Sequence, residues 1–171
     1  MTVSGNDYDC VETCISKKID IYEEFMINYK LDYQNTIKIT EEREVIYTIS
    51  SKHRGHNKNK SNWSIKMPIE VSLFKSALKK GYEDKTKYTA WNLYIVNEEI
   101  SEVGYTVDKE RVKIAKFVDS NHNEIWHGYP ANYIKNNQDI PSVSVLNLWY
   151  NEKIITLATM RKIRGGQPCN L

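Results

Sequence analysis

The chain has 171 residues, of which 40% are hydrophobic and 27% are charged, and its formal net charge is +2. This composition is typical of one soluble globular domain that buries its own core, and so small a charge does not by itself argue for nucleic acid as a partner. No apolar run is long enough for a transmembrane helix, so neither a membrane span nor a membrane partner is expected.

The first ten residues, MTVSGNDYDC, have no basic start and no apolar block, so no signal peptide is expected. The three cysteines do not form an even framework, which indicates a reducing, cytoplasmic compartment. The abundance of lysine, asparagine, isoleucine and tyrosine fits an AT-rich bacterial or phage genome. No cofactor is expected, because the chain has no Walker loop, dinucleotide-binding glycine triplet, nucleophile elbow or zinc ribbon.

A long amphipathic helix is predicted over residues 9–30. Asp9 can cap it, Glu12 takes the capping-box position, and apolar residues recur at three- and four-residue spacing. Cys10 and Cys14 lie one turn apart and could form half of a zinc site, but the chain has no second cysteine pair. We expect these cysteines to act as small hydrophobic residues.

A basic and entirely polar segment, residues 52–62, follows a strand predicted over residues 43–51. The simpler interpretation is an exposed, solvated loop. The same loop is the segment best suited to phosphate, because lysine and arginine side chains release counterions when they bind it. Its candidate nucleic-acid-binding residues are Lys52, His53, Arg54, His56, Lys58 and Lys60, and the two histidines could also ligate a metal.

A second helix and a series of strands are predicted in the middle of the chain. Alternating apolar residues indicate a short strand over residues 63–67, and Pro68 and Gly81 mark the start and the end of a helix. Further strands are predicted over residues 88–96, 100–107, 112–118 and 124–129. Their succession predicts an antiparallel meander.

The last two of these strands form a predicted hairpin around the densest group of turn residues in the chain, residues 119–123. Asparagine and aspartate tolerate left-handed backbone and bond their own chain, which favours a turn. The hairpin matches a calcium loop only in its first positions. Glu124 stands where that loop requires glycine and Pro130 where it requires glutamate, so a calcium site is not expected.

Four polar residues of the hairpin could carry metal or acid–base chemistry. If the protein is an enzyme, its candidate catalytic residues are His122, Glu124 and His127. The candidate metal ligands are Asp119, His122 and His127. Because the spacing does not ensure that these side chains converge, we expect instead a turn histidine in water and a strand histidine bonded at a sheet face.

Aromatic side chains gather around Gly128 and Pro130 in the same segment. Such rings supply a large contact area together with a polar group, as binding hot spots do. The alternative is that they fill the end of the core. The candidate protein-binding residues are Trp126, His127, Tyr129 and Tyr133.

The end of the chain is predicted to add one helix and one strand. Residues 141–150 favour a helix, although Val143, Val145 and Leu148 would also suit a strand. Residues 153–163 are predicted to form the last strand and residues 165–171 a loose tail. Cys169 on this tail has no local histidine or acid to activate it, so it is expected to be exposed and without a catalytic role.

These elements predict a single α+β domain over residues 1–171, with loose ends at residues 1–8 and 165–171. A mostly antiparallel sheet of about five to seven strands is expected, covered on one face by the N-terminal, middle and C-terminal helices. The predicted function is docking to a protein partner, as in small immunity, antitoxin or defence-accessory proteins. The alternatives are a metal-dependent nuclease and a non-catalytic nucleic-acid-binding protein that uses residues 52–60.

Overall fold

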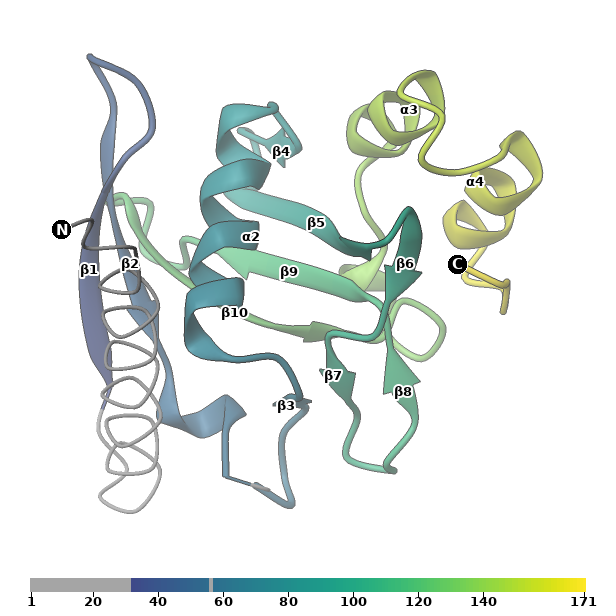
Figure 1. The fold of residues 1–171 in the computed structure, drawn as a ribbon, viewed down its shortest axis with the longest axis horizontal. Coiled ribbons are helices and arrows are strands. Elements are labelled where there is room, and N and C mark those ends of the chain that lie inside the picture. The colour runs from purple at the N-terminus through teal and green to yellow at the C-terminus, as the bar shows by residue number, and fades with distance from the viewer. Residues whose placement is uncertain (1–31, 56) are drawn as a thin grey trace, which may run out of the picture.

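The computed structural model describes residues 32–55 and 57–171 (Figure 1). The helix predicted over residues 9–30, the loose end predicted over residues 1–8, and His56 lie outside this described part. Within it, the chain forms an α+β fold with a large central sheet, a small second sheet and three α-helices. None of the described helices combines the length and the apolar character that crossing a bilayer requires.

The central sheet has seven strands in the described ranges and is mixed. Its strand order is β1-β2-β10-β9-β5-β4, with β6 added to β5. Every pair is antiparallel except β2 and β10, which are parallel, so the sheet departs at this point from the antiparallel arrangement that was predicted. The strands are β1 (Tyr33–Lys38), β2 (Glu44–Ile49), β4 (Glu83–Asp84), β5 (Thr89–Val96), β6 (Glu99–Ser101), β9 (Ile114–Val118) and β10 (Ile125–Ala131).

The meander predicted over residues 88–129 is only partly correct. β9 pairs with β10 across the predicted turn, which confirms the hairpin. β5, however, pairs directly with β9, and the segment expected to form a strand between them supplies β6 and part of the small sheet. That small sheet has the order β3 (Asn62–Trp63), β7 (Gly104–Tyr105), β8 (Arg111–Val112).

Helix α2 (Met67–Lys79) covers one face of the central sheet, as Figure 1 shows. Pro68 stands in its first turn, where a missing N–H costs nothing, and Gly81 follows its end with a φ of +71°, so both predicted limits are correct. Phe74 of this helix packs on Tyr47 of β2 and Phe117 of β9, with ring centroids 4.4 and 5.3 Å away. The aromatic core therefore lies between α2 and the sheet.

Gly128 of β10 permits this packing. A Cβ atom at its position would lie 2.5 Å from Tyr47 Oη and 2.6 Å from Phe117 Cδ1, which is closer than real contacts allow. The strand predicted over residues 124–129 is longer than expected, because Pro130 lies inside β10 and pairs with Ala115. The strand thus continues past the proline to Ala131.

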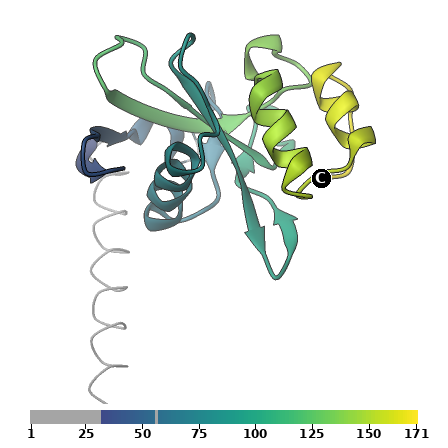
Figure 2. The same cartoon turned by 90° about the horizontal axis from the view of Figure 1, so that it is seen from above.

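Two helices lie side by side at one end of the sheet (Figures 1 and 2). The helix preferred over residues 141–150 is confirmed as α3 (Val143–Asn151), whose N-cap Ser142 accepts a hydrogen bond from the Val145 N–H. The strand predicted over residues 153–163 is wrong, because that segment contains helix α4 (Leu157–Arg164). The Thr156 hydroxyl caps α4 by accepting a bond from the Thr159 N–H at 3.1 Å, and such caps favour a helix over a strand.

The tail predicted to be loose, residues 165–171, is packed against the fold. The Tyr133 hydroxyl lies 3.2 Å from the Cys169 sulfur, and the Lys113 ammonium donates to the Leu171 carbonyl. Cys169 is consequently half-buried rather than exposed.

Candidate functional site

The face of the central sheet opposite α2, here called the back face, carries a polar hollow. Strand register sets its side chains in two rows: Thr89, Val118 and His127 in one, and Trp91, Lys116 and Tyr129 in the other. Asn92, the strand neighbour of Trp91, points to α2 and donates to the Leu73 carbonyl, so these two rows point away from that helix. They line a hollow of about 530 Å³, the Lys116 hollow, together with Lys87, Ser120 and residues of the segment 137–142.

Lys116 is the most unusual residue of this hollow, because its side chain is buried in the middle of β9. Its ammonium donates to the Gln138 carbonyl and lies 3.3 Å from Asp139 Oδ1. Burial lowers the pKa of Lys116, and the nearby Lys87 lowers it further, whereas Asp139 raises it. Two cations thus share this side of the sheet: Lys116 pairs with Asp139, and Lys87 acts electrostatically on Asp84.

Asp139 joins the segment before α3 to the back face. It belongs to the short 3-10 helix η2 (Asn137–Asp139), and its carboxylate accepts bonds from the Tyr129 hydroxyl at 2.8 Å and the Asn132 N–H at 3.0 Å, in addition to Lys116. Burial and this carboxylate raise the pKa of Tyr129 well above its usual value. Because Asp139 is buried and has several donors around it, its charge is already compensated within the fold.

The loop of residues 52–62 reaches the same face through a histidine. His53, in the short 3-10 helix η1 (Ser51–His53), stacks on Tyr129 with ring centroids 5.5 Å apart, and its Nδ1 lies 2.8 Å from the Ser61 carbonyl. Burial lowers the pKa of both His53 and His127, and Lys52 lowers both further. These two imidazoles are therefore neutral near pH 7 and face a field of nearby ammonium groups.

Two lining residues carry buried polar atoms for which the described part of the chain offers no hydrogen-bond partner. These are the Thr89 hydroxyl and the Trp91 indole N–H. Thr89 is 9% exposed and Trp91 is 2% exposed. Buried donors are usually bonded in folded proteins, to protein or to ordered water, so these two groups beside one hollow make it a candidate binding site.

The residues predicted for metal or acid–base chemistry do not form one cluster, although Asp119 acts electrostatically on His127. His122 stacks on Tyr88 at 3.8 Å, and Glu124 pairs with Arg43 at 3.3 Å. Asp119 holds the turn by accepting bonds from two backbone N–H groups, those of Asn123 and Glu124. Across the described ranges, no group of three or more histidine, cysteine, aspartate or glutamate side chains could hold a metal ion.

The candidate protein-binding residues divide into two pairs. Trp126 is 2% exposed, packs on Phe74 and donates to Glu124, while Tyr133 is 7% exposed, so the expectation that these rings form surface is wrong. They follow the alternative that the sequence had left open, which is filling the core. His127 and Tyr129 lie half-buried on the back face beside the hollow.

The basic loop also divides. Arg54 is 6% exposed and forms an ion pair with the fully buried Glu70 of α2, so its prediction as an exposed phosphate-binding residue is wrong. Lys52, Lys58 and Lys60 are exposed as expected. The lysines of the loop thus add positive charge near the back face. Arg54 anchors the loop to α2 through Glu70.

Of the residues that line the hollow, only His127 and Tyr129 were among the predicted site residues, and Lys87, Thr89, Trp91 and Lys116 were missed. The signal that could have found them is Lys116 itself, a lysine in a strand that is otherwise apolar on both faces. A lysine at a buried strand position must reach a partner, and that partner is a reason to look for a site.

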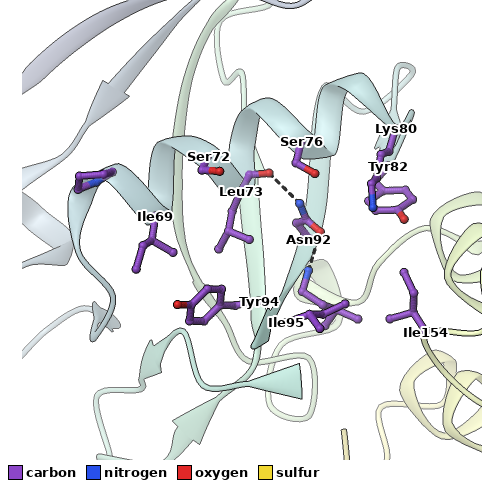
Figure 3. A pocket seen from close by; sticks show the side chains of 12 residues that line it. Ile69, Ser72, Leu73, Ser76, Lys80, Tyr82, Asn92, Tyr94, Ile95 and Ile154 are labelled. Carbon is purple, nitrogen blue, oxygen red and sulfur yellow. Dashed lines mark hydrogen bonds between the residues drawn. The ribbon is translucent and has the colours of Figure 1, made fainter. Parts of the chain in front are cut away.

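A second hollow, of about 430 Å³, lies between α2 and β5 (Figure 3). Its walls are mainly apolar, with Ile69, Leu73 and Ile95 among them. The amide of Asn92 is already used here, since it donates to the Leu73 carbonyl at 2.8 Å and accepts from the Leu93 N–H at 2.9 Å. Because this groove is mainly apolar and the Asn92 amide in it is already bonded, the Lys116 hollow is the stronger candidate for a functional site.

Comparison with known proteins adds no relative to this geometry. No protein-family model, no curated protein and no solved structure matches the chain. The residues of the back face are therefore the basis for inferring a function.

Proposed function

We propose that the protein is a non-catalytic binding module that docks to a protein partner through the back face of its central sheet. The observation that carries the proposal is the Lys116 hollow, where two buried polar groups, Thr89 Oγ1 and Trp91 Nε1, lack a hydrogen-bond partner in the described residues. His127 and Tyr129 lie beside them and are half-buried. Histidine and tyrosine at such a position supply contact area together with polar groups.

The dispersal of the acids and histidines favours binding over hydrolysis. Asp119, His122 and Glu124 each have a separate structural partner, and His127 lies on the back face. General acid–base or metal-assisted hydrolysis needs such groups to converge within hydrogen-bond or ligand distance of one reacting atom. The proposal therefore assigns no catalytic residue.

Non-catalytic binding of nucleic acid is the second candidate, and one observation favours it. Lys52 and Lys60 act electrostatically on His53, and Lys87 acts on Lys116, so the lysines of the loop and of the sheet lie near the same face. Phosphate contacts of this kind make affinity fall steeply with salt. The buried carboxylate of Asp139 and the small net charge of the chain, +2, favour the protein partner instead.

The proposal is tested by partner capture from the native host with a matched pair of variants. His127→Glu places a carboxylate on the back face, and Ser72→Glu places the same side chain on the exposed surface of α2, which covers the other face. We expect the wild type and Ser72→Glu to retain the same partner and His127→Glu to lose it. Both variants are first required to keep the circular dichroism spectrum of the wild type. Equal capture by both variants would place the docking surface elsewhere.

The biological setting is proposed from composition. A cytoplasmic compartment in a bacterium or phage-infected cell agrees with the three cysteines and the AT-rich amino-acid usage. A role of the immunity, antitoxin or defence-accessory type agrees with a small chain that carries a docking surface. Sequencing the genes beside the coding sequence tests this setting directly.

A further inference from the structure

The Lys116 hollow has the features of an oxyanion site rather than those of a general contact surface. We propose that it binds a single oxyanion, a carboxylate or a phosphate, between the ammonium groups of Lys87 and Lys116. This inference rests on the proposed docking function, because it names the chemical group of the partner that would enter the hollow.

The charges of Lys87 and Lys116 favour an anion in the hollow. Lys116 is 5% exposed, and its ammonium has three N–H donors, of which two are directed to the Gln138 carbonyl and Asp139. The same ammonium lies 5.5 Å from the centroid of the Tyr129 ring, which also lines the hollow. Lys87 lines the same hollow and repels Lys116, as its lowering effect on the Lys116 pKa indicates. An anion placed between them would replace this repulsion with two attractions.

Two residues that line the hollow carry hydrogen-bond donors without an acceptor in the described residues. In the described ranges, neither the Thr89 hydroxyl nor the Trp91 indole N–H has a partner, although both atoms are buried. An indole N–H donates and cannot accept, so a ligand atom that satisfies it must be an acceptor. A carboxylate or phosphate carries two or more acceptor oxygens, so one such group has an acceptor for each of these donors.

The start of α3 also favours an anion in the hollow. Its N-cap residue, Ser142, lines the hollow, and the first backbone N–H groups of a helix carry partial positive charge that favours anions. The Ser142 hydroxyl is used to cap the Val145 N–H, so the helix start itself is ordered before any ligand arrives. The helix start and the two lysines thus act on the same space with the same sign.

The test is a titration of the full chain with sodium phosphate and sodium acetate at constant ionic strength, followed by NMR of the tryptophan indole N–H groups. Trp91 and Trp149 both have a buried indole N–H without a partner in the described residues, but only Trp91 lines the hollow. We expect the Trp91 resonance, assigned with Trp91→Phe, to shift with saturation at millimolar anion while that of Trp149 stays in place. A shift with both anions indicates a carboxylate or phosphate group, and a shift with phosphate alone indicates a phosphorylated partner.

Charge-reversal variants make the test specific. Lys87→Glu should weaken anion binding about fivefold to thirtyfold, because an attraction becomes a repulsion at a partly exposed site. Lys79→Glu, with the same change on the exposed surface of α2, should leave it unchanged. Thr89→Val, which removes one donor at nearly constant volume, should weaken binding without changing the fold.

Three outcomes would overturn the inference. They are no shift of the Trp91 resonance with either anion, equal weakening by Lys87→Glu and Lys79→Glu, and tight binding of a single-stranded oligonucleotide at the same face when neither anion binds alone. The failure is separable from that of the docking proposal. If no anion binds but His127→Glu still abolishes partner capture, docking stands and the oxyanion site fails. If an anion binds and no variant alters capture, the docking proposal fails while the anion site stands.

Discussion

Replacing Arg54 with methionine tests whether the basic loop is anchored by a buried ion pair. Methionine keeps the apolar stem of arginine but removes the guanidinium that pairs with Glu70. The Glu70 side chain is 0% exposed, and its other oxygen accepts a bond from the Tyr47 hydroxyl at 2.7 Å. The variant would therefore remove the Arg54 cation from beside the buried Glu70 carboxylate.

The magnitude follows from what such a charge costs. Breaking a buried pair by removing one partner costs about 3 to 5 kcal/mol, because the remaining charge is desolvated and uncompensated. For a chain of this size, that loss lowers the melting temperature by roughly 6 to 20 °C. Glu70→Gln, added to Arg54→Met, removes the stranded charge and keeps an acceptor for Tyr47, so the double variant should recover a large part of the loss.

The assay is equilibrium unfolding in urea, followed by tryptophan fluorescence, with the free energy of unfolding obtained from the midpoint and slope. Lys52→Met is the matched control, because Lys52 is an exposed cation two residues away and its loss should cost less than about 0.5 kcal/mol. If Arg54→Met unfolds within about 1 kcal/mol of the wild type, the guanidinium does not compensate Glu70 and the reasoning is refuted.

Three further predictions concern the core and the back face. Trp126→Ala should lower the free energy of unfolding by about 3 to 5 kcal/mol, measured in urea, because a buried indole is lost from the core. A change below about 1 kcal/mol would show that this ring does not belong to the core. Gly128→Ala should cost about 1 to 3 kcal/mol by overpacking, whereas Gly165→Ala, whose nearest contact is at 3.4 Å, should be nearly neutral in the same assay. Because burial holds the pKa of His53 and His127 below the ordinary 6.5, the unfolded chain binds more protons than the folded chain below that pH, and the free energy of unfolding should fall as the pH drops. The double variant His53→Gln and His127→Gln should flatten this fall between pH 7 and 5. An unchanged slope would contradict the assignment to these two histidines.

The local elements were predictable because their causes lie within a few residues. Pro68 and Gly81 set the limits of α2, and the turn residues 119–123 set the hairpin of β9 and β10. The strand predicted over residues 153–163 is wrong because local signals compete in that segment. A short apolar run after Tyr150 suits a strand or a helix, and the Thr156 cap decided for the helix.

The sequence by itself determined an α+β domain, the limits of α2 and the position of the central hairpin, because periodicity and turn chemistry are properties of neighbouring residues. Only the tertiary structure decided that β2 lies parallel to β10, that Arg54 is buried against Glu70, and that Lys116 shares a hollow with Thr89 and Trp91. These contacts join residues far apart in the chain, and their formation depends on which faces of the sheet are covered. A local pattern can show that a side chain needs a partner, but the fold selects which partner it meets.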